Sequence, residues 1–140
     1  MSVKDIINQK GHLSTIGTAF LCDRVMTEDS PLVTLYKKAG AIPLVRGNTP
    51  QSALSLHTSN TIFGEARNPY DNSRSWGGAS GGDAGRVASR CVPLGLGSDI
   101  GGSLRFPATF CGIAGFKPTQ NRLTKRGTAA PRLDGFNMYD

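Results

Sequence analysis

The chain has 140 residues, of which 38% are hydrophobic and 19% are charged, with a formal net charge of +6. This length suits one domain or less, and this composition argues against intrinsic disorder. Lys, Arg, Gly or Pro interrupts every apolar stretch, so none reaches the roughly 18 residues that a membrane-spanning helix needs. The basic residues occur singly or in pairs without interleaved aromatic residues, so the sequence does not predict a nucleic-acid surface.

The three cysteines, Cys22, Cys91 and Cys111, are widely spaced and odd in number. They form no C-x-x-C pair, so the sequence predicts neither a disulfide framework nor a metal site. We expect them to be small buried side chains, which favours an intracellular reducing compartment. The N-terminus lacks the long apolar segment of a signal peptide.

The first clear element in chain order is a helix that begins near residue 30. Asp29 or Ser30 is the candidate N-cap, and Pro31 suits the first turn. Apolar residues then recur at helical spacing until Gly40, which supplies the C-terminal cap. The apolar run at 41–45 predicts a short buried strand. Helix, glycine and strand in this order indicate an α/β layer.

Two glycine-rich loops organise the second half of the chain. The polar, turn-rich stretch 67–75 predicts a surface loop. It runs into the glycines of 77–82, where a helix over 83–90 can begin. Residues 93–97 predict a small buried strand, and the second glycine loop, 98–103, follows directly. No internal repeat or linker divides this α/β chain.

These loops allow three chemical interpretations. Neither G-x-G-x-x-G nor G-x-x-x-x-G-K-[ST] occurs, so nucleotide binding is not predicted. Residues 78–82 match the G-x-S-x-G nucleophile elbow around Ser80, but that motif needs a strand before it and a histidine after it. The only histidines, His12 and His57, precede it. The third interpretation is a serine nucleophile activated by a lysine, with glycine N–H groups that stabilise the oxyanion.

The sequence resembles the amidase signature family across nearly the whole chain. The segments that carry the resemblance are GGASGG at 77–82, PLGLGSDIGGSLRFP at 93–107, FCGIAGFKPT at 110–119 and, at the N-terminus, Val3-Lys4-Asp5. Weaker motifs at 48–52, 68–69 and 121–123 are most similar to the fatty acid amide hydrolase branch. The resemblance implies a mixed β-sheet flanked by helices, of which residues 1–140 are expected to form a single partial domain.

The resemblance also implies roles for individual residues. Ser103 would be the nucleophile that forms an acyl-enzyme, and Lys4 the base that later protonates the leaving amine. The oxyanion hole would consist of the backbone N–H groups of Ile100, Gly101, Gly102 and Ser103. Asp99 and Arg105 match positions near the nucleophile and would order its loop, although a surface ion pair is an alternative. The resemblance implies no metal and no organic cofactor.

The sequence departs from the family pattern at Ala79. The family has a serine there, the first of G-G-S-S-G-G, which bridges lysine and nucleophile from a cis peptide. Alanine has no hydroxyl to relay a proton, and it need not keep the cis geometry. The neighbouring Ser80 matches the second serine, whose side chain is expected to point elsewhere. We therefore expect weak or absent hydrolysis of an amide or ester bond.

Two functions stay open at this point. One is a hydrolase of reduced competence whose small-molecule substrate is an amide or ester, fatty acid amides included. The other is a catalytically inactive subunit with a structural role in a larger assembly. An alanine introduced at position 79 to trap substrate would leave the same sequence. By resemblance Ala53 and Leu54 line an acyl channel, but they are too few to select a substrate. Membrane association would need regions outside these residues.

Overall fold

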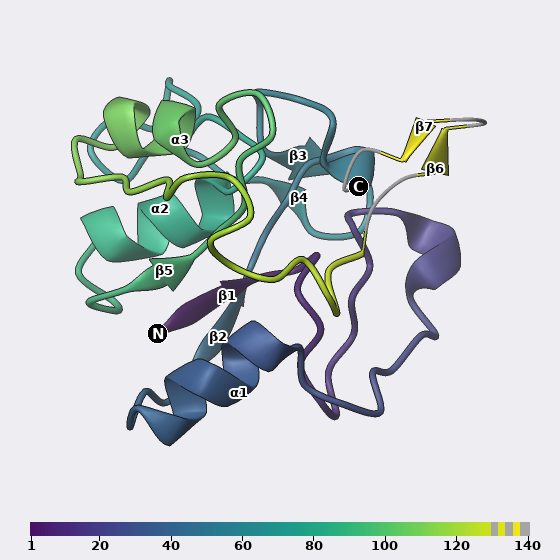
Figure 1. Ribbon diagram of the computed structural model, residues 1–140. Coiled ribbons are helices and arrows are strands. Elements are labelled where there is room, and N and C mark those ends of the chain that lie inside the picture. Colours follow the sequence, from purple (N-terminus) through teal and green to yellow (C-terminus); the bar gives the residue numbers. More distant parts are fainter. Residues whose placement is uncertain (130–131, 134–135, 138–140) are drawn as a thin grey trace.

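A three-stranded parallel sheet forms the centre of the computed structural model, which describes residues 1–129, 132–133 and 136–137 (Figure 1). The strands lie in the order β2-β1-β5, where β1 is Ser2–Lys4, β2 is Val45–Gly47 and β5 is Gly95–Leu96. Parallel strands adjacent to helices are the pattern expected of an α/β layer. The predicted α/β class, a mixed β-sheet flanked by helices, is confirmed in its class, and within the described residues the central sheet is parallel.

Short helices and hairpins surround this sheet. The α-helices are α1 (Pro31–Lys38), α2 (Gly81–Ala88) and α3 (Arg105–Phe110), with 3-10 turns η1 (Ala19–Leu21) and η2 (Gln51–Ala53). Two antiparallel pairs complete the element order: β3 (Ser59–Asn60) with β4 (Gly64–Glu65), and β6 (Arg132–Leu133) with β7 (Phe136–Asn137). None of the helices in the described residues is long and apolar enough to cross a membrane.

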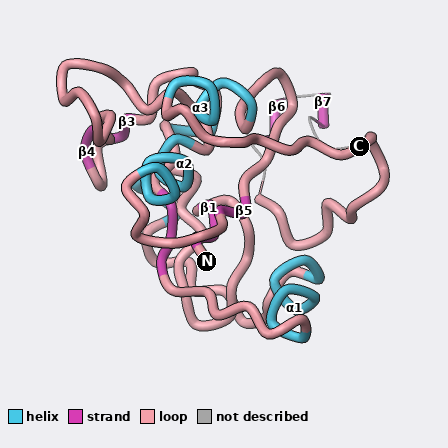
Figure 2. The backbone as a smooth tube through the Cα atoms, turned by 90° about the vertical axis from the view of Figure 1, so that its left-hand side faces the viewer, coloured by secondary structure: helices cyan, strands magenta, loops and turns pink. Residues whose placement is uncertain are grey.

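Strand β1 separates an apolar layer from a polar one. Successive side chains of a strand point to opposite faces. Val3 belongs to the core cluster with Val33 of α1 and Leu96 of β5. Ser2 faces the other way and donates a hydrogen bond to Asp83 of α2. Both views of the backbone place the strands between α1 and α2 (Figures 1 and 2). Lys4, two residues after Ser2, shares the face of the sheet that α2 covers.

The helix predicted near residue 30 is confirmed, but the strand predicted after it is mostly wrong. Ser30 is the N-cap, its hydroxyl accepts the Val33 N–H at 3.2 Å, and Pro31 is the first helical residue. The predicted strand 41–45 begins only at Val45, because its partner β1 begins at Ser2 and no ladder exists earlier. Ala41 still packs against the core cluster, whereas Ile42 and Leu44 are mostly exposed.

The second half shows the same pattern of confirmed helix and shortened strand. The strand predicted at 93–97 is reduced to Gly95–Leu96. The helix predicted over 83–90, with its N-terminus at the glycines of 77–82, is found at Gly81–Ala88. Helix α3, which contains Pro107, was not predicted from the sequence. That proline is the third helical residue, where the backbone N–H has no intrahelical acceptor to lose.

Helix α2 lies unusually close to the chain beside β2. A Cβ atom added to Gly82 would be 2.2 Å from the backbone nitrogen of Asn48, so only glycine fits there. The other end of α2 packs through Ala84 and Ala88 against Cys111. This packing fixes the first turn of α2, which carries Asp83, against the sheet.

The cysteines differ from the expectation that all are buried. Cys111 is 1% exposed, and burial raises the pKa of its thiol to about 11. Cys91 is exposed and Cys22 is half-buried, and all three are free thiols. The spacing of cysteines in a sequence does not determine burial, because each position depends on what packs over it.

Candidate active site

Lys4 ends β1 as a buried lysine, with 1% of its surface exposed. Its Nζ atom donates a hydrogen bond to Ser98 Oγ at 2.8 Å. Burial lowers the pKa of Lys4 to about 7, although the negative charges of Asp83 and Asp99 act to raise it. Burial therefore favours the neutral form of the Lys4 amine near neutral pH, compared with an ordinary lysine. A neutral amine is what a lysine needs in order to accept a proton.

Ser80 connects the two glycine loops. Its backbone N–H donates to the Ser103 carbonyl oxygen at 2.9 Å. Its hydroxyl lies 3.2 Å from both the N–H and the carbonyl oxygen of Ser98. Hydrogen bonds thus link Lys4 to Ser98, Ser98 to Ser80 and Ser80 to the Ser103 loop, the last two through backbone atoms and the last one through the Ser103 carbonyl oxygen. The Ser80 hydroxyl is occupied by Ser98 backbone atoms.

Asp99 organises the loop in front of Ser103. Its carboxylate accepts backbone N–H groups from Gly102 (2.7 Å), Leu104 (3.3 Å) and Arg105 (3.2 Å). The Arg105 guanidinium adds two bonds, Nε at 2.9 Å and Nη2 at 3.1 Å. Desolvation acts to raise the pKa of Asp99, but the bonds from Arg105 and the backbone outweigh it and lower the pKa to about 2. Asp99 is therefore a fixed negative charge that holds the loop.

The hydrogen bonds to Asp99 use one of the four backbone N–H groups that were predicted to form the oxyanion hole. The N–H of Gly102 points at Asp99 Oδ1. The other three predicted donors are those of Ile100, Gly101 and Ser103. Ile100 is 50% exposed and Gly101 is exposed as well, so this side of the loop is open to an approaching molecule.

Ala79 is completely buried directly before Ser80. The peptide bond between Gly78 and Ala79 is cis, so the geometry that the resemblance implies for a serine is present with alanine. A methyl group cannot donate or accept a proton. The buried position at 79 therefore carries no hydroxyl that could join Lys4 to Ser103.

Two polar residues of this site were missed by the sequence-based reasoning. Ser98 holds the Lys4 amine, yet in the sequence it is only the first residue of a glycine loop. Asp83 is 3% exposed and contributes to the pKa of Lys4, yet in the sequence it is an ordinary residue of a helix start. A short polar residue beside glycines is the one available signal, and it is shared with most surface turns.

The remaining sequence candidates lie apart from this chain of hydrogen bonds. His57 is exposed, with Nδ1 2.9 Å from Ser75 Oγ and Nε2 3.5 Å from Glu65, so the structure does not pair it with Ser80. His12 is exposed too. Ala53 packs against the core cluster, and Leu54 is 51% exposed. Among the described residues, no three His, Cys, Asp or Glu side chains are grouped to hold a metal ion.

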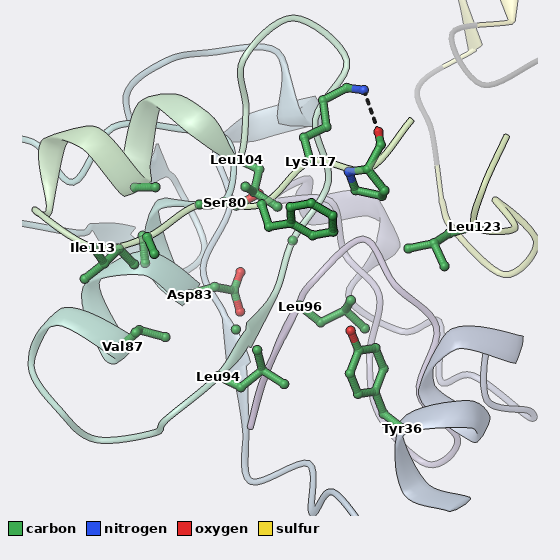
Figure 3. Close-up of a pocket in the computed structure, with 18 of the residues that line it drawn as sticks. Tyr36, Ser80, Asp83, Val87, Leu94, Leu96, Leu104, Ile113, Lys117 and Leu123 are labelled. Carbon is green, nitrogen blue, oxygen red and sulfur yellow. Dashed lines mark hydrogen bonds between the residues drawn. The ribbon is translucent and has the colours of Figure 1, made fainter. Parts of the chain in front are cut away.

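A cavity of about 810 Å³ lies beside α2 and β5 (Figure 3). Ser80 and Asp83 are the site residues that reach it, and its described lining is otherwise largely apolar, with Leu96, Leu104 and Ile113 among its side chains. Lys4 and Ser103 are not among the described lining residues. The cavity therefore borders the buried side of the site rather than the nucleophile.

Comparison with known proteins finds relatives along nearly the whole chain. Residues 1–136 match the family described as Amidase. The chain is 46% identical over 127 residues to fatty-acid amide hydrolase 1 of Sus scrofa, with 91% of this chain and 22% of that protein covered. It is 42% identical over 137 residues to vitamin D3 hydroxylase-associated protein of Gallus gallus, with 98% and 29% covered.

Solved structures show the same likeness in three dimensions. A structure of fatty acid amide hydrolase superposes with a TM-score of 0.89 at 31% identity, over 92% of this chain and 23% of that one. A glutamyl-tRNA(Gln) amidotransferase subunit from Thermotoga maritima gives 0.87 at 35%, over 91% and 28%. The chain spans less than a third of the length of these relatives. The family match, the sequence identities and the structural superpositions agree with one another, so the chain belongs to the amidase signature family of hydrolases.

Proposed function

We propose that this chain carries the catalytic centre of a serine hydrolase that cleaves an amide or ester bond, with Ser103 as nucleophile and Lys4 as base. The observation that carries the proposal is the buried Lys4 amine, which is joined through Ser98 and Ser80 to the Ser103 loop. Its pKa of about 7 suits proton transfer at neutral pH. The likeness to fatty-acid amide hydrolases favours a fatty acid amide as the substrate.

The reaction has two halves. Ser103 Oγ attacks the carbonyl carbon, its proton passes to Lys4, and the carbonyl oxygen becomes an oxyanion facing the backbone N–H groups of Ile100, Gly101 and Ser103. The carbon–nitrogen bond then breaks, and the protonated Lys4 returns its proton to the leaving amine. Water hydrolyses the resulting ester of Ser103. Asp99 takes no proton, because its pKa of about 2 keeps it ionised throughout.

Ala79 limits this reaction. Without a hydroxyl between Lys4 and Ser103, proton transfer loses much of a contribution of roughly 10²–10⁴-fold. We expect Ala79→Ser to raise the turnover of an acyl-amide by a factor in that range. The position is buried beside Ser80, so the added hydroxyl enters the site. Equal turnover by Ala79→Ser and the unchanged chain would show that the reaction does not need the relay.

A serine-directed fluorophosphonate tests the nucleophile independently of the substrate. We expect labelling at Ser103 that disappears in Ser103→Ala. The matched control is Ser73→Ala, which removes the hydroxyl of an exposed serine in the loop 67–75 and should leave labelling unchanged. Labelling that persists in Ser103→Ala would contradict the assignment.

A second candidate function is a catalytically inactive subunit of a larger assembly. The specific observation that favours it is the methyl group of Ala79 at a fully buried position of the site. One matching structure is described as a vestigial protein complex, and other relatives are named as amidotransferase subunits. A folded sample that neither labels at Ser103 nor gains turnover in Ala79→Ser would favour this function over the hydrolase.

A further inference from the structure

We propose that Asp83 is a positioning residue of the site: its buried carboxylate lies against the sheet on the face of Lys4 and controls the protonation of the Lys4 amine. The proposal deepens the proposed hydrolase and rests on Lys4 as its base. It assigns a function to a side chain that belongs to neither the Ser103 loop nor the Lys4 strand.

The strand register places Asp83 on the same face as Lys4. In a parallel ladder, paired residues direct their side chains to one face. Lys4 pairs with Gly47, and a Cβ atom added to Gly47 would meet the Asp83 carboxylate at 2.2–2.4 Å. Ser2 pairs with Gly95, whose added Cβ would lie 3.2 Å from Asp83 Cβ. Because Gly47 and Gly95 have no side chains, the sheet has space for Asp83 on both sides of β1.

Its hydrogen bonds leave Asp83 only partly satisfied. Ser2 Oγ donates to Oδ1 and fixes the carboxylate. Oδ2 is buried and accepts no hydrogen bond within the described part of the chain. Figure 3 shows the carboxylate extending from α2 toward the strands. A buried carboxylate with one unpaired oxygen is stabilised as an anion mainly by nearby positive charge.

The charged groups around the pair come from several elements. Lys4 of β1, Arg46 of β2 and Arg86 of α2 act on Asp83, and Asp83 and Asp99 act on Lys4. Desolvation raises the pKa of Asp83 to about 6, against the opposing effects of Ser2 and the three cations. Burial thus shifts the pKa of Lys4 down and that of Asp83 up, and an ionised Asp83 favours the protonated amine.

The test measures the protonation of Lys4 directly. In the full chain labelled with [13Cε]lysine, NMR follows the Cε resonance of Lys4 with pH, assigned by its loss in Lys4→Met. An opposite charge at close range shifts a pKa by about 1–3 units. Asp83→Asn should therefore lower the titration midpoint of Lys4 by one unit or more. A shift below about 0.3 unit would overturn the proposal.

The matched control is Asp5→Asn. Asp5 is buried, directly follows Lys4 and lies on the opposite face, where its carboxylate binds Thr15 and faces Arg46. Removing this charge should leave the Lys4 midpoint unchanged. An equal shift in Asp5→Asn and Asp83→Asn would also overturn the proposal, because it would mean that any nearby negative charge has the same effect.

A measurement on the unchanged sequence keeps the proposal testable if Asp83→Asn does not fold. With [13Cγ]aspartate added, the Asp83 resonance should titrate near pH 6, and the Lys4 Cε resonance should show a smaller second step at that same pH. A single step in Lys4 would overturn the coupling. An inactive chain that shows both steps would refute the proposed hydrolase alone, and an active chain that shows one step would refute the role of Asp83 alone.

Discussion

Two aspartates act on Lys4 from two regions of the molecule, and their pKa values shift in opposite directions. Asp99, in the loop after β5, receives three backbone N–H groups and the Arg105 guanidinium. Asp83, in the first turn of α2, receives one hydroxyl. The pKa of Asp99 falls to about 2, and that of Asp83 rises to about 6. Burial penalises both carboxylates, and it penalises the fully buried Asp83 more than the half-buried Asp99. The depth of burial and the number and charge of the donors together decide which carboxylate stays ionised.

The difference separates a structural charge from a titratable one. Asp99 keeps its charge near neutral pH and well below it, so it can hold the loop that carries Ser103. Asp83 gains or loses its proton close to the pH at which Lys4 does. The negative charge of Asp99 therefore acts on Lys4 at constant strength near neutral pH, whereas the negative charge of Asp83 depends on pH.

The largest effect is expected from filling the space beside Asp83. Gly47→Ala places a methyl group 2.2–2.4 Å from the Asp83 carboxylate, so this buried carboxylate must leave its position or the backbone must shift, at a cost of up to about 3 kcal/mol in unfolding free energy. Urea denaturation measures it. The control is Gly101→Ala in the Asp99 loop, where nothing lies within 4 Å of the added carbon. Similar losses in both variants would mean that α2 is not tightly packed on the sheet.

Neutralising the loop carboxylate should have the next largest effect. Asp99→Asn removes the ion pair with Arg105 and should lower the unfolding free energy by about 1.5–3 kcal/mol at pH 7. Because the folded-state pKa of Asp99 lies below its ordinary value of 3.8, its contribution is complete above pH 4 and is lost as the pH falls towards 2. Denaturation between pH 2 and pH 7 should show this slope in the unchanged chain and not in the variant.

Neutralising Asp83 should have a smaller effect of opposite sign. The pKa of Asp83 is raised in the folded protein, so the folded state favours its neutral form and its ionisation costs stability as the pH rises from 3.8 through 6. Asp83→Asn should therefore raise the unfolding free energy by about 1–2 kcal/mol at pH 8. The gain should vanish below pH 4. A loss of stability at pH 8 would mean that attraction to Lys4 outweighs desolvation.

The smallest effect is expected at Asp71, an aspartate near the surface whose hydrogen bonds resemble those of Asp99. Asp71, in the surface loop 67–75, accepts the Ser73 N–H, the Ser73 hydroxyl and Arg74 Nε. Water can replace these bonds there, so Asp71→Asn should leave the urea midpoint unchanged within error. A midpoint shift as large as that of Asp99→Asn would show that the number of hydrogen-bond donors alone, without burial, determines how much such a carboxylate contributes to stability.

The sequence predicted those parts of the fold that depend on neighbours along the chain. The α1 cap at Ser30 and the start of α2 at the glycines are local, because a cap residue and the first turn it stabilises lie within four positions. The strands at 41–45 and 93–97 were predicted too long, because strand length depends on a distant partner. Strand β2 pairs along all three residues of β1, and β5 pairs with only two of them.

The same distinction applies to the site. The glycine-serine loops, Lys4, Ser103 and the alanine at 79 are visible in the sequence as a pattern, and the family match confirms the resemblance that this pattern carries. Ser98 as the partner of Lys4 and Asp83 as its neighbour are not visible. They lie 94 and 79 positions from Lys4, and nothing in a one-dimensional pattern says which polar residues a fold brings together.

The sequence by itself thus determined the class of reaction and the glycine-rich loops on which that reaction depends. The high glycine content, 18 of 140 residues, indicated loops with free backbone donors and did not show which glycines serve another purpose. Only the tertiary structure showed that Gly47 and Gly95 leave room for a carboxylate against the sheet. The reason is physical: a proton affinity depends on charges and solvent within a few ångströms, and those distances exist only after the strands and α2 have packed.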